Sequence, residues 1–289
     1  MINIKNNLNG WLIINKPRGI SSAGVIGRLK FLLRPQKIGH AGTLDPLATG
    51  VLPIALGKAT RLISYVMDET KTYEFDIKWG TETETDDLEG FETITSNKRP
   101  QKQEILAILK QFRGEIIQTP SPYSAIKIGG KRAYDLVRRG EKVTMPSRKI
   151  TVHELDLIKN SKTEASFIAK VSKGTYIRTL AHDIAHALKT VGVVTRLHRT
   201  QDGPFKIEQA VLLEKDLKIL PIEYVLENLP KLVVSQEIVE RIVHGQRIKD
   251  EKLTMGLPQK TPIAVWNLEK VIAIMHIQKD VLHPDCILV

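Results

Sequence analysis

The stretch Gly39-His40-Ala41-Gly42-Thr43-Leu44-Asp45-Pro46-Leu47-Ala48-Thr49-Gly50 departs most clearly from regular secondary-structure patterns. Its three glycines and one proline predict an irregular backbone, which we expect to form a loop from Gly39 to Pro53. Because Asp45 precedes a proline, its backbone is held extended. Leucines lie on both sides of Asp45, and a half-buried acid among apolar neighbours needs a cationic partner. Asp45 is therefore a candidate catalytic carboxylate; the alternative is an ordinary turn.

A basic residue suited to pair with this acid ends a second constrained segment, Ser172-Lys173-Gly174-Thr175-Tyr176-Ile177-Arg178. We expect a helix from Tyr176 to Leu188, with Arg178 in its first turn. A cation gains nothing from the helix dipole at that end. The position of Arg178 therefore indicates pairing with a carboxylate or a phosphate; the alternative is a solvated arginine.

Two histidines of the same predicted helix, His182 and His186, are four residues apart and share one face. In the zinc-protease pattern a glutamate directly follows the first histidine, but here the residue is Asp183. The sequence shows no third ligand, so we expect no metal and place the histidines on a polar face or near RNA. The patterns of phosphate-binding loops, dinucleotide sites and serine hydrolases are also missing, and we expect no cofactor.

The charge of the chain favours a polyanionic partner. The 289 residues carry 43 Lys+Arg against 32 Asp+Glu, a net charge of +11, and the pI is near 9.6. Nucleic acid is the commonest polyanion, and a general basic bias without a partner is the alternative. Residues 231–289 hold 8 Lys+Arg against 7 Asp+Glu, so the positive field belongs mainly to the first 230 residues.

The cysteine count and the apolar runs predict a cytoplasmic protein. The single cysteine, Cys286, excludes an internal disulfide. No apolar run reaches the roughly 20 residues that span a bilayer, and the first residues lack a signal-peptide core. Because no long exposed apolar stripe stands out, we also expect a monomer that does not bind membranes.

Strand-like and helix-like runs follow one another without regular alternation, which favours an α+β fold over a doubly wound sheet. Strands are expected at 10–15, 72–79, 150–158 and 165–171, helices after Ser21 or Ser22 and at 59–67, 104–112 and 176–188, and an acidic loop at 82–92. After Pro221 and Pro230, short strands are expected at 263–266, 271–275 and 286–289. The sequence thus predicts two domains, 1–230 and 231–289.

The segment from Gly39 to Gly50 resembles the catalytic loop of the TruB family, the tRNA pseudouridine-55 synthases. Other segments resemble further motifs of that family in the same order: Gly10–Ser22 (with Asn15 where aspartate is commoner), Lys71–Phe75, Thr85–Gly90, Pro122–Lys127, Gly130–Tyr134, Arg139–Gly140, Ser172–Arg178 and Arg196–Thr200. The resemblance covers nearly all of residues 10–210. Residues 231–289 resemble the small PUA-type RNA-binding domain in position, size and strand pattern.

The resemblance implies a mixed, largely antiparallel sheet with a central catalytic cleft, followed by a small β-rich PUA-like domain. It also implies an enzyme that isomerises uridine-55 in the T-arm loop of tRNA, without a cofactor or metal. In this reaction the N1 glycosidic bond breaks, the uracil turns, and C5 bonds to the ribose C1′. A uridine buried in the folded loop must first be flipped out.

The resemblance assigns catalysis to Asp45, Tyr73 and Arg178. Asp45 acts at the glycosidic bond, Arg178 keeps it ionised and in place, and Tyr73 stacks on the uracil. The other site residues are assigned to substrate and RNA: His40 to the space that the flipped base vacates, Tyr176 and Leu197 to the pocket lining, Lys16 to the catalytic loop or a phosphate, and Lys127, Lys131 and Arg132 to the RNA backbone.

Three alternatives stay open from the sequence. The first is a noncatalytic RNA-binding or tRNA-folding protein on the same scaffold. The second is a metal hydrolase that uses His182 and His186. The third is guide-RNA-directed modification, against which the short C-terminal unit argues.

Overall fold

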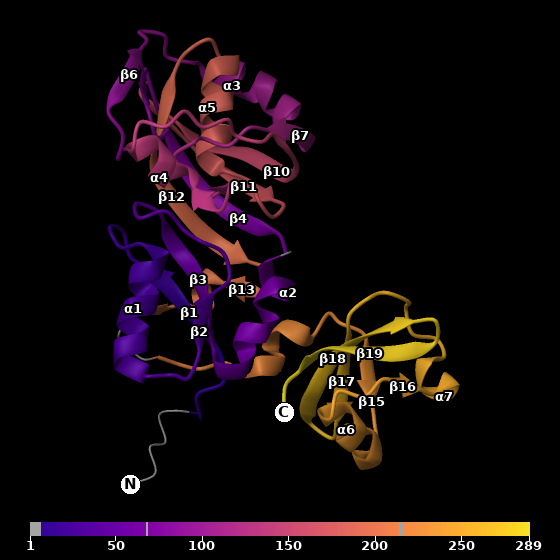
Figure 1. Cartoon of the computed structure of the whole chain (residues 1–289). Coiled ribbons are helices and arrows are strands. Elements are labelled where there is room, and N and C mark those ends of the chain that lie inside the picture. Colours follow the sequence, from indigo (N-terminus) through magenta and orange to yellow (C-terminus); the bar gives the residue numbers. More distant parts are fainter. Residues whose placement is uncertain (1–6, 68, 214, 216) are drawn as a thin grey trace.

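A mixed sheet of ten strands forms the larger part of the molecule (Figure 1). The computed structural model describes residues 7–67, 69–213, 215 and 217–289. The sheet order is β14 (Val211–Leu212), β1 (Gly10–Lys16), β3 (Thr49–Leu56), β12 (Gly192–Asp202), β4 (Lys71–Trp79), β11 (Glu164–Val171), β10 (Arg148–Asn160) and β7 (Gly114–Gln118), with β2 (Ile38–His40) on β3 and β13 (Phe205–Lys206) on β12. The β1–β14 and β3–β12 pairs are parallel and the others antiparallel. The predicted α+β fold with a largely antiparallel sheet is confirmed.

Strand β12 joins the two halves of this sheet, because it pairs with β4 along most of its length and with β3 at only two positions. At this junction the backbones of Gly50 and Arg199 lie very close. A Cβ atom on Gly50 would lie 2.2 Å from the Arg199 carbonyl oxygen, and the φ of Gly50 is +101°. Only glycine tolerates both conditions, so Gly50 fixes where the segment between β2 and β3 meets β12.

Strand β4 has the alternating burial that its sequence predicts. Its odd-numbered residues are buried, and most residues between them are half-buried. Phe75 stacks on Phe167 of β11 with ring centroids 5.3 Å apart. The core around these rings also includes buried side chains of α1 (Ser22–Leu33), α3 (Lys102–Leu109) and α5 (Ile177–Ala187). Apolar residues at helical spacing thus cover the strands, as hydrophobic burial favours.

The structure corrects several local predictions. Only residues 41–48 of the expected 39–53 loop are irregular, because β2 and β3 occupy the rest. The predicted helix at 59–67 is a 3₁₀ helix, η2 (Gly57–Leu62), followed by α2 (Ile63–Met67). The acidic 82–92 segment is the turn of a hairpin, β5 (Thr81–Thr83) and β6 (Glu92–Thr95). The sequence does not predict strand β12, because its buried residues do not alternate along the chain.

A second sheet of five strands is built from the C-terminal part of the chain. Its order is β15 (Lys231–Val233), β17 (Ile263–Asn267), β18 (Lys270–Gln278), β19 (Val281–Ile287) and β16 (Ile248–Lys249), with α6 (Gln236–Val243) and α7 (Glu251–Thr254) beside it. It has its own apolar core, which includes Ile242, Val265 and Met275. Val271 and Leu288 belong instead to an apolar cluster with Trp11 of β1. The second sheet therefore packs against the half of the larger sheet that contains β1 (Figure 1).

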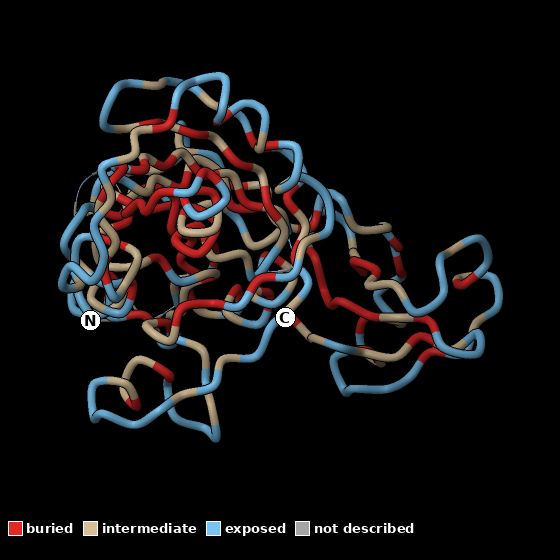
Figure 2. Tube along the Cα trace, turned by 90° about the horizontal axis from the view of Figure 1, so that it is seen from above, coloured by how far each residue is buried: buried red, intermediate tan, exposed pale blue. Residues whose placement is uncertain are grey.

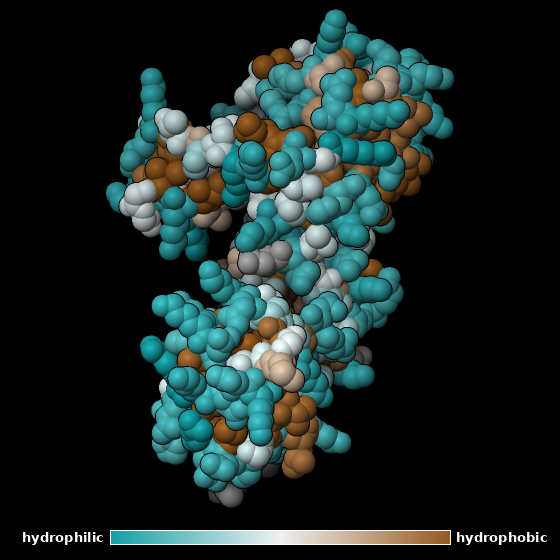
Figure 3. Space-filling view, turned by 90° about the vertical axis from the view of Figure 1, so that its right-hand side faces the viewer, coloured by the Kyte–Doolittle hydropathy of each residue, from teal (hydrophilic) through white to brown (hydrophobic). Residues whose placement is uncertain are grey.

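Buried residues concentrate inside the larger body, with a smaller set in the part formed by the C-terminal strands (Figure 2). Hydrophilic side chains cover most of the face shown in Figure 3. No helix among the described residues is long and apolar enough to cross a membrane.

Candidate active site

Residues at the end of β1 and at the start of α1 hold the segment 41–48, which carries Asp45. The Ser22 hydroxyl accepts a hydrogen bond from Leu44 N at 2.8 Å and donates one to Leu44 O at 2.9 Å. The Lys16 ammonium donates to Pro46 O at 3.0 Å, and Gly19 N donates to the same oxygen at 2.8 Å. Both residues that flank Asp45 are therefore fixed through their backbones.

Arg178 places its guanidinium among four partners from three distant segments. Its Nε lies 3.0 Å from Asp45 Oδ2, and its Nη1 lies 3.4 Å from Asp87 Oδ2. Nη1 also donates to Thr85 O at 2.6 Å, and Nη2 donates to Tyr123 O at 3.1 Å. Arg178 is buried, while the Asp45 side chain keeps 36% of its surface exposed. The structure thus brings Asp45 and Arg178 together with the acid open to a ligand.

The charge state of these groups follows from their surroundings. Burial would lower the pKa of Arg178, but Asp45, Asp87 and Asp86 raise it above its usual value, so the guanidinium stays charged. Burial lowers the pKa of Lys16 to about 8, although Asp45 acts in the opposite direction. Lys16 is fully buried and also donates to Pro17 O and Ile20 O. Its hydrogen bond to Pro46 O supports the Asp45 segment.

Asp45 lines a small hollow of about 250 Å³ that is open to solvent. The hollow is lined by Asp45, Leu47, Ala48, Asp87, Arg178, Val194, Thr195 and Leu197. Leu197 lies where the sequence analysis expects it. The lining combines apolar side chains with three charged ones, a composition that suits a flat polar ring.

Tyr176 and Tyr73 do not belong to the lining of this hollow. Tyr176 precedes α5 and is held by Gln118, whose amide group exchanges two hydrogen bonds with its backbone. The Arg148 guanidinium lies 4.7 Å from the centroid of the Tyr176 ring. The Tyr73 hydroxyl lies against a second buried arginine, Arg199, whose Nη1 is 3.5 Å away. Burial raises the pKa of Tyr73, so its hydroxyl stays protonated.

Arg199 is a site residue that sequence reasoning missed. It donates from Nε to Val51 O at 2.7 Å and from Nη2 to Gly42 O at 3.0 Å. Its Nη1 lies 3.2 Å from Asp202 Oδ2, and the other oxygen of Asp202 is 3.0 Å from the ammonium of Lys71. The sequence places Arg199 inside a family-like motif, but only the fold shows that it holds the start of the Asp45 segment.

The residues assigned to RNA lie at the rim. His40 ends β2 and is half-buried, and its Nδ1 is buried with no hydrogen-bond partner. Burial and the charge of Arg199 lower the pKa of His40, so the imidazole is neutral near pH 7. Lys127, Lys131 and Arg132 are exposed on a short hairpin of β8 (Lys127–Ile128) and β9 (Lys131–Arg132). This hairpin begins shortly after Tyr123, whose carbonyl accepts a hydrogen bond from Arg178.

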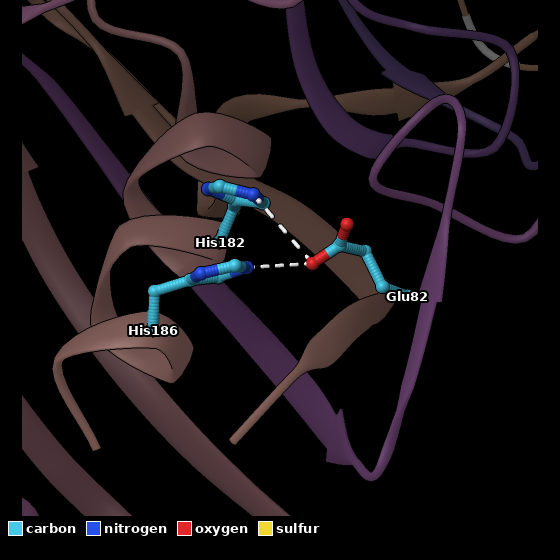
Figure 4. A group of neighbouring side chains, drawn as sticks. All are labelled: Glu82, His182 and His186. Carbon is cyan, nitrogen blue, oxygen red and sulfur yellow. Dashed lines mark hydrogen bonds and ion pairs between the residues drawn. The ribbon is translucent and has the colours of Figure 1, made fainter. Parts of the chain in front are cut away.

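The sequence shows no third ligand for His182 and His186, and the structure supplies a candidate. The structure places the Glu82 carboxylate beside both histidines, so that the three residues could hold a metal ion (Figure 4). Glu82 comes from β5, far from α5 in the sequence, which is why spacing could not reveal it.

Comparison with solved structures identifies the class of protein. The fold is that of the Cbf5/TruB-type pseudouridine synthases. The chain superimposes on a Cbf5–Nop10–Gar1 complex with a TM-score of 0.75 and 25% identity, covering 97% of this chain and 85% of that one. It also superimposes on an H/ACA RNP bound to a substrate RNA containing 2′-deoxyuridine, with a TM-score of 0.75 and 23% identity, covering 100% and 87%.

Sequence comparison identifies the family. Residues 30–177 match the model of the TruB family pseudouridylate synthase (N terminal domain). The tRNA pseudouridine synthase B of Zymomonas mobilis is 44% identical over 89% of this chain and 91% of its own. That of Gluconacetobacter diazotrophicus is 40% identical over 96% of both. The chain belongs to the TruB family and is an enzyme that isomerises uridine.

Proposed function

We propose that this enzyme converts uridine to pseudouridine in tRNA, at position 55 of the T-arm loop, and that Asp45 is its catalytic carboxylate. The observation that carries the proposal is the ion pair between Asp45 and the buried Arg178, 3.0 Å apart at the edge of an open hollow. The names of the relatives, tRNA pseudouridine synthase B, support tRNA as the substrate.

The chemistry requires one ionised oxygen beside the nucleoside. The bond from N1 to C1′ breaks, the uracil turns in place, C5 bonds to C1′, C5 loses its proton and N1 gains one. A carboxylate can assist by attack at C1′ or at C6, or by removing the 2′ proton. Each route needs an ionised Asp45 that points toward the nucleoside. The Arg178 guanidinium pairs with this carboxylate and orients it, because its own position is fixed by Asp87 and two carbonyls.

The remaining residues have positioning roles in this proposal. Leu47 and Leu197 line the hollow where the uracil turns. Tyr73, whose hydroxyl lies against Arg199, does not line the hollow in this structure, and in this proposal its ring stacks on the uracil once the base is bound. His40, neutral and half-buried, fits the space that a flipped base leaves, and Tyr176 flanks the start of α5.

We propose that the basic hairpin and the C-terminal unit hold the tRNA. Lys127, Lys131 and Arg132 offer three exposed cations, the kind of contact that positions an RNA backbone. We take residues 231–289 as a PUA-like RNA-binding domain and residues 1–230 as the synthase domain, because the five-stranded sheet begins at Lys231. We further propose that the enzyme acts as a monomer in the cytoplasm. Size-exclusion chromatography with light scattering tests the oligomeric state.

The test is tritium release from C5-tritiated uridine in a T-arm stem-loop RNA. We expect release by the wild type and none by Asp45→Asn, with the RNA affinity of the variant within about tenfold, since phosphate contacts dominate binding. Asp156→Asn is the matched control, because that exposed aspartate pairs with Arg113 on the surface and should retain full release.

Two results would contradict the proposal. Tight RNA binding without any release by the wild type would favour a noncatalytic RNA-binding protein or another target uridine. Release by Asp45→Asn at the wild-type rate would remove Asp45 from the chemistry while leaving the synthase activity intact.

A further inference from the structure

Glu82, His182 and His186 form a compact group beside α5 (Figure 4), and none of them lines the hollow. The two imidazoles stack with ring centroids 4.1 Å apart and an interplanar angle of 27°. The Nε2 of His186 lies 2.6 Å from Glu82 Oε2, and the Nε2 of His182 lies 3.6 Å from the same oxygen. Both histidines therefore aim the same ring nitrogen at one carboxylate oxygen.

The other ring nitrogen of His182 already has a partner. Its Nδ1 lies 3.3 Å from the Asp183 carboxylate, so a proton on Nδ1 leaves the lone pair of Nε2 facing Glu82. A carboxylate behind a histidine is the usual second partner of a metal-binding imidazole, because it fixes the tautomer and the ring orientation. Asp183, which interrupts the zinc-protease pattern, is placed to do this for His182.

The geometry matches the ligand set of a transition metal. The candidate ligand atoms of the three residues all lie within 4.8 Å of one another, and no other group of three is this close among residues 7–67, 69–213, 215 and 217–289. A tetrahedral Zn²⁺ with ligands at about 2.0–2.1 Å separates them by roughly 3.3 Å. The 3.6 Å spacing already fits, and the 2.6 Å contact opens by less than about 1 Å when a metal replaces the hydrogen bond.

We propose that Glu82, His182 and His186 bind one divalent transition-metal ion of the Zn²⁺ class, with water in the fourth position. The side chains of His182 and His186 are 31% and 46% exposed, so the metal can enter from solvent. Imidazole nitrogens select Zn²⁺, Ni²⁺ and Cu²⁺ over Mg²⁺ and Ca²⁺, whose preferred ligands are oxygens.

The bound metal would clamp the β5–β6 hairpin to α5. Glu82 begins the turn that also contains Thr85 and Asp87, the partners of Arg178. Arg178 lies one helical turn before His182 on the same helix. The ion is thus structural in this proposal: it joins the hairpin to the helix at one point, while Arg178 joins them at another.

The experiment titrates the untagged, metal-depleted full chain with ZnCl₂ by isothermal calorimetry, and with CoCl₂ by visible absorption. We expect one equivalent of each metal to bind, with the visible bands of tetrahedral cobalt. His186→Gln and Glu82→Gln should each weaken Zn²⁺ binding at least about tenfold, because the loss of even an outer-shell partner of a metal ligand costs about that much. His186 is the safer variant for folding, because its side chain is nearly half exposed.

His276→Gln is the matched control. His276 also stacks on a second histidine and pairs with a carboxylate, Asp285 at 2.7 Å, but its group does not gather three ligand atoms as closely. We expect this variant to bind Zn²⁺ like the wild type. Hydrogen exchange gives a second readout: Zn²⁺ should slow exchange of the 82–90 amides in the wild type and not in His186→Gln.

Two outcomes would overturn the proposal. One is the absence of a calorimetric signal and of a cobalt spectrum with the folded wild type. The other is Zn²⁺ binding that survives both His186→Gln and Glu82→Gln, which would place the ion elsewhere. Neither outcome bears on pseudouridine formation, which the tritium assay measures separately.

Discussion

Two buried arginines hold the Asp45 segment, and they do so in different ways. Arg178 reaches the aspartate itself, with Nε 3.0 Å from the carboxylate. Arg199 reaches the backbone at Gly42, and its charge is balanced by Asp202 and not by Asp45. Arg178 therefore contacts the carboxylate that we propose as catalytic, whereas Arg199 fixes the backbone that leads to it.

The surroundings of the two arginines explain this division. The side chain of Asp45 is 36% exposed, while that of Asp202 is fully buried. An ion pair at an open hollow leaves one partner free to meet a substrate. An ion pair in the core, here extended to Lys71, has no such freedom and stabilises the fold only if every member stays paired. Losing Arg178 should thus cost activity, and losing Arg199 should cost stability.

The largest expected effect is on turnover in Arg178→Ala. Without its cation Asp45 loses both its orientation and its charge partner, and we expect tritium release to fall on the order of 100-fold or more. RNA affinity should stay within about tenfold of the wild type. Single-turnover release at saturating enzyme measures this, and near-normal turnover would remove Arg178 from the site.

The next effect is on folding in Arg199→Met. This change removes donors to Val51 and Gly42 and leaves Asp202 with Lys71 alone. We expect the free energy of unfolding to fall by about 3–5 kcal/mol, as for other broken buried ion pairs. Urea denaturation of both arginine variants checks the comparison, which would fail if Arg178→Ala proved the less stable of the two.

A smaller, pH-dependent effect is expected in Lys16→Met, which removes the third support of the Asp45 segment. The carbonyls of Pro17 and Ile20 lose this donor, while Pro46 O keeps the hydrogen bond from Gly19 N, and we expect a cost of about 1–3 kcal/mol near pH 7. The pKa of Lys16 is about 8 in the folded protein and 10.5 in the unfolded chain, so the unfolded chain binds more protons between these values.

The stability of the wild type relative to Lys16→Met should therefore rise as the pH increases from 8 to 10.5. Urea denaturation of both proteins at several pH values measures the difference. A stability gap that is flat across this range would show that Lys16 keeps an ordinary pKa in the folded state.

Much of the site could be predicted from local sequence. A carboxylate between leucines and before a proline indicated a half-buried acid, and Asp45 is one. The alternation of Lys71 to Trp79 indicated a strand with one buried face, and β4 has it. Arg178 was placed at the start of a helix, and it is the second residue of α5. These features depend on residues close in the chain, where periodicity and turn chemistry act.

Other features could not be predicted in this way. Arg199 and Glu82 were not singled out, although the first lies in a quoted motif and the second in an acidic segment. Their partners, Gly42 for Arg199 and His186 for Glu82, are 157 and 104 residues away. Strand β12 was missed because its burial depends on β4 and β3 on either side of it and not on its own pattern.

The sequence by itself thus determined the local conformations and the position of the candidate acid, because glycine, proline and apolar spacing restrict the backbone over a few residues. The tertiary structure decided which cation faces which anion and which carboxylate faces the two histidines. The physical reason is that an ion pair or a ligand set requires atoms within about 4 Å, and only the packing of β12, α5 and the β5–β6 hairpin brings such distant residues that close.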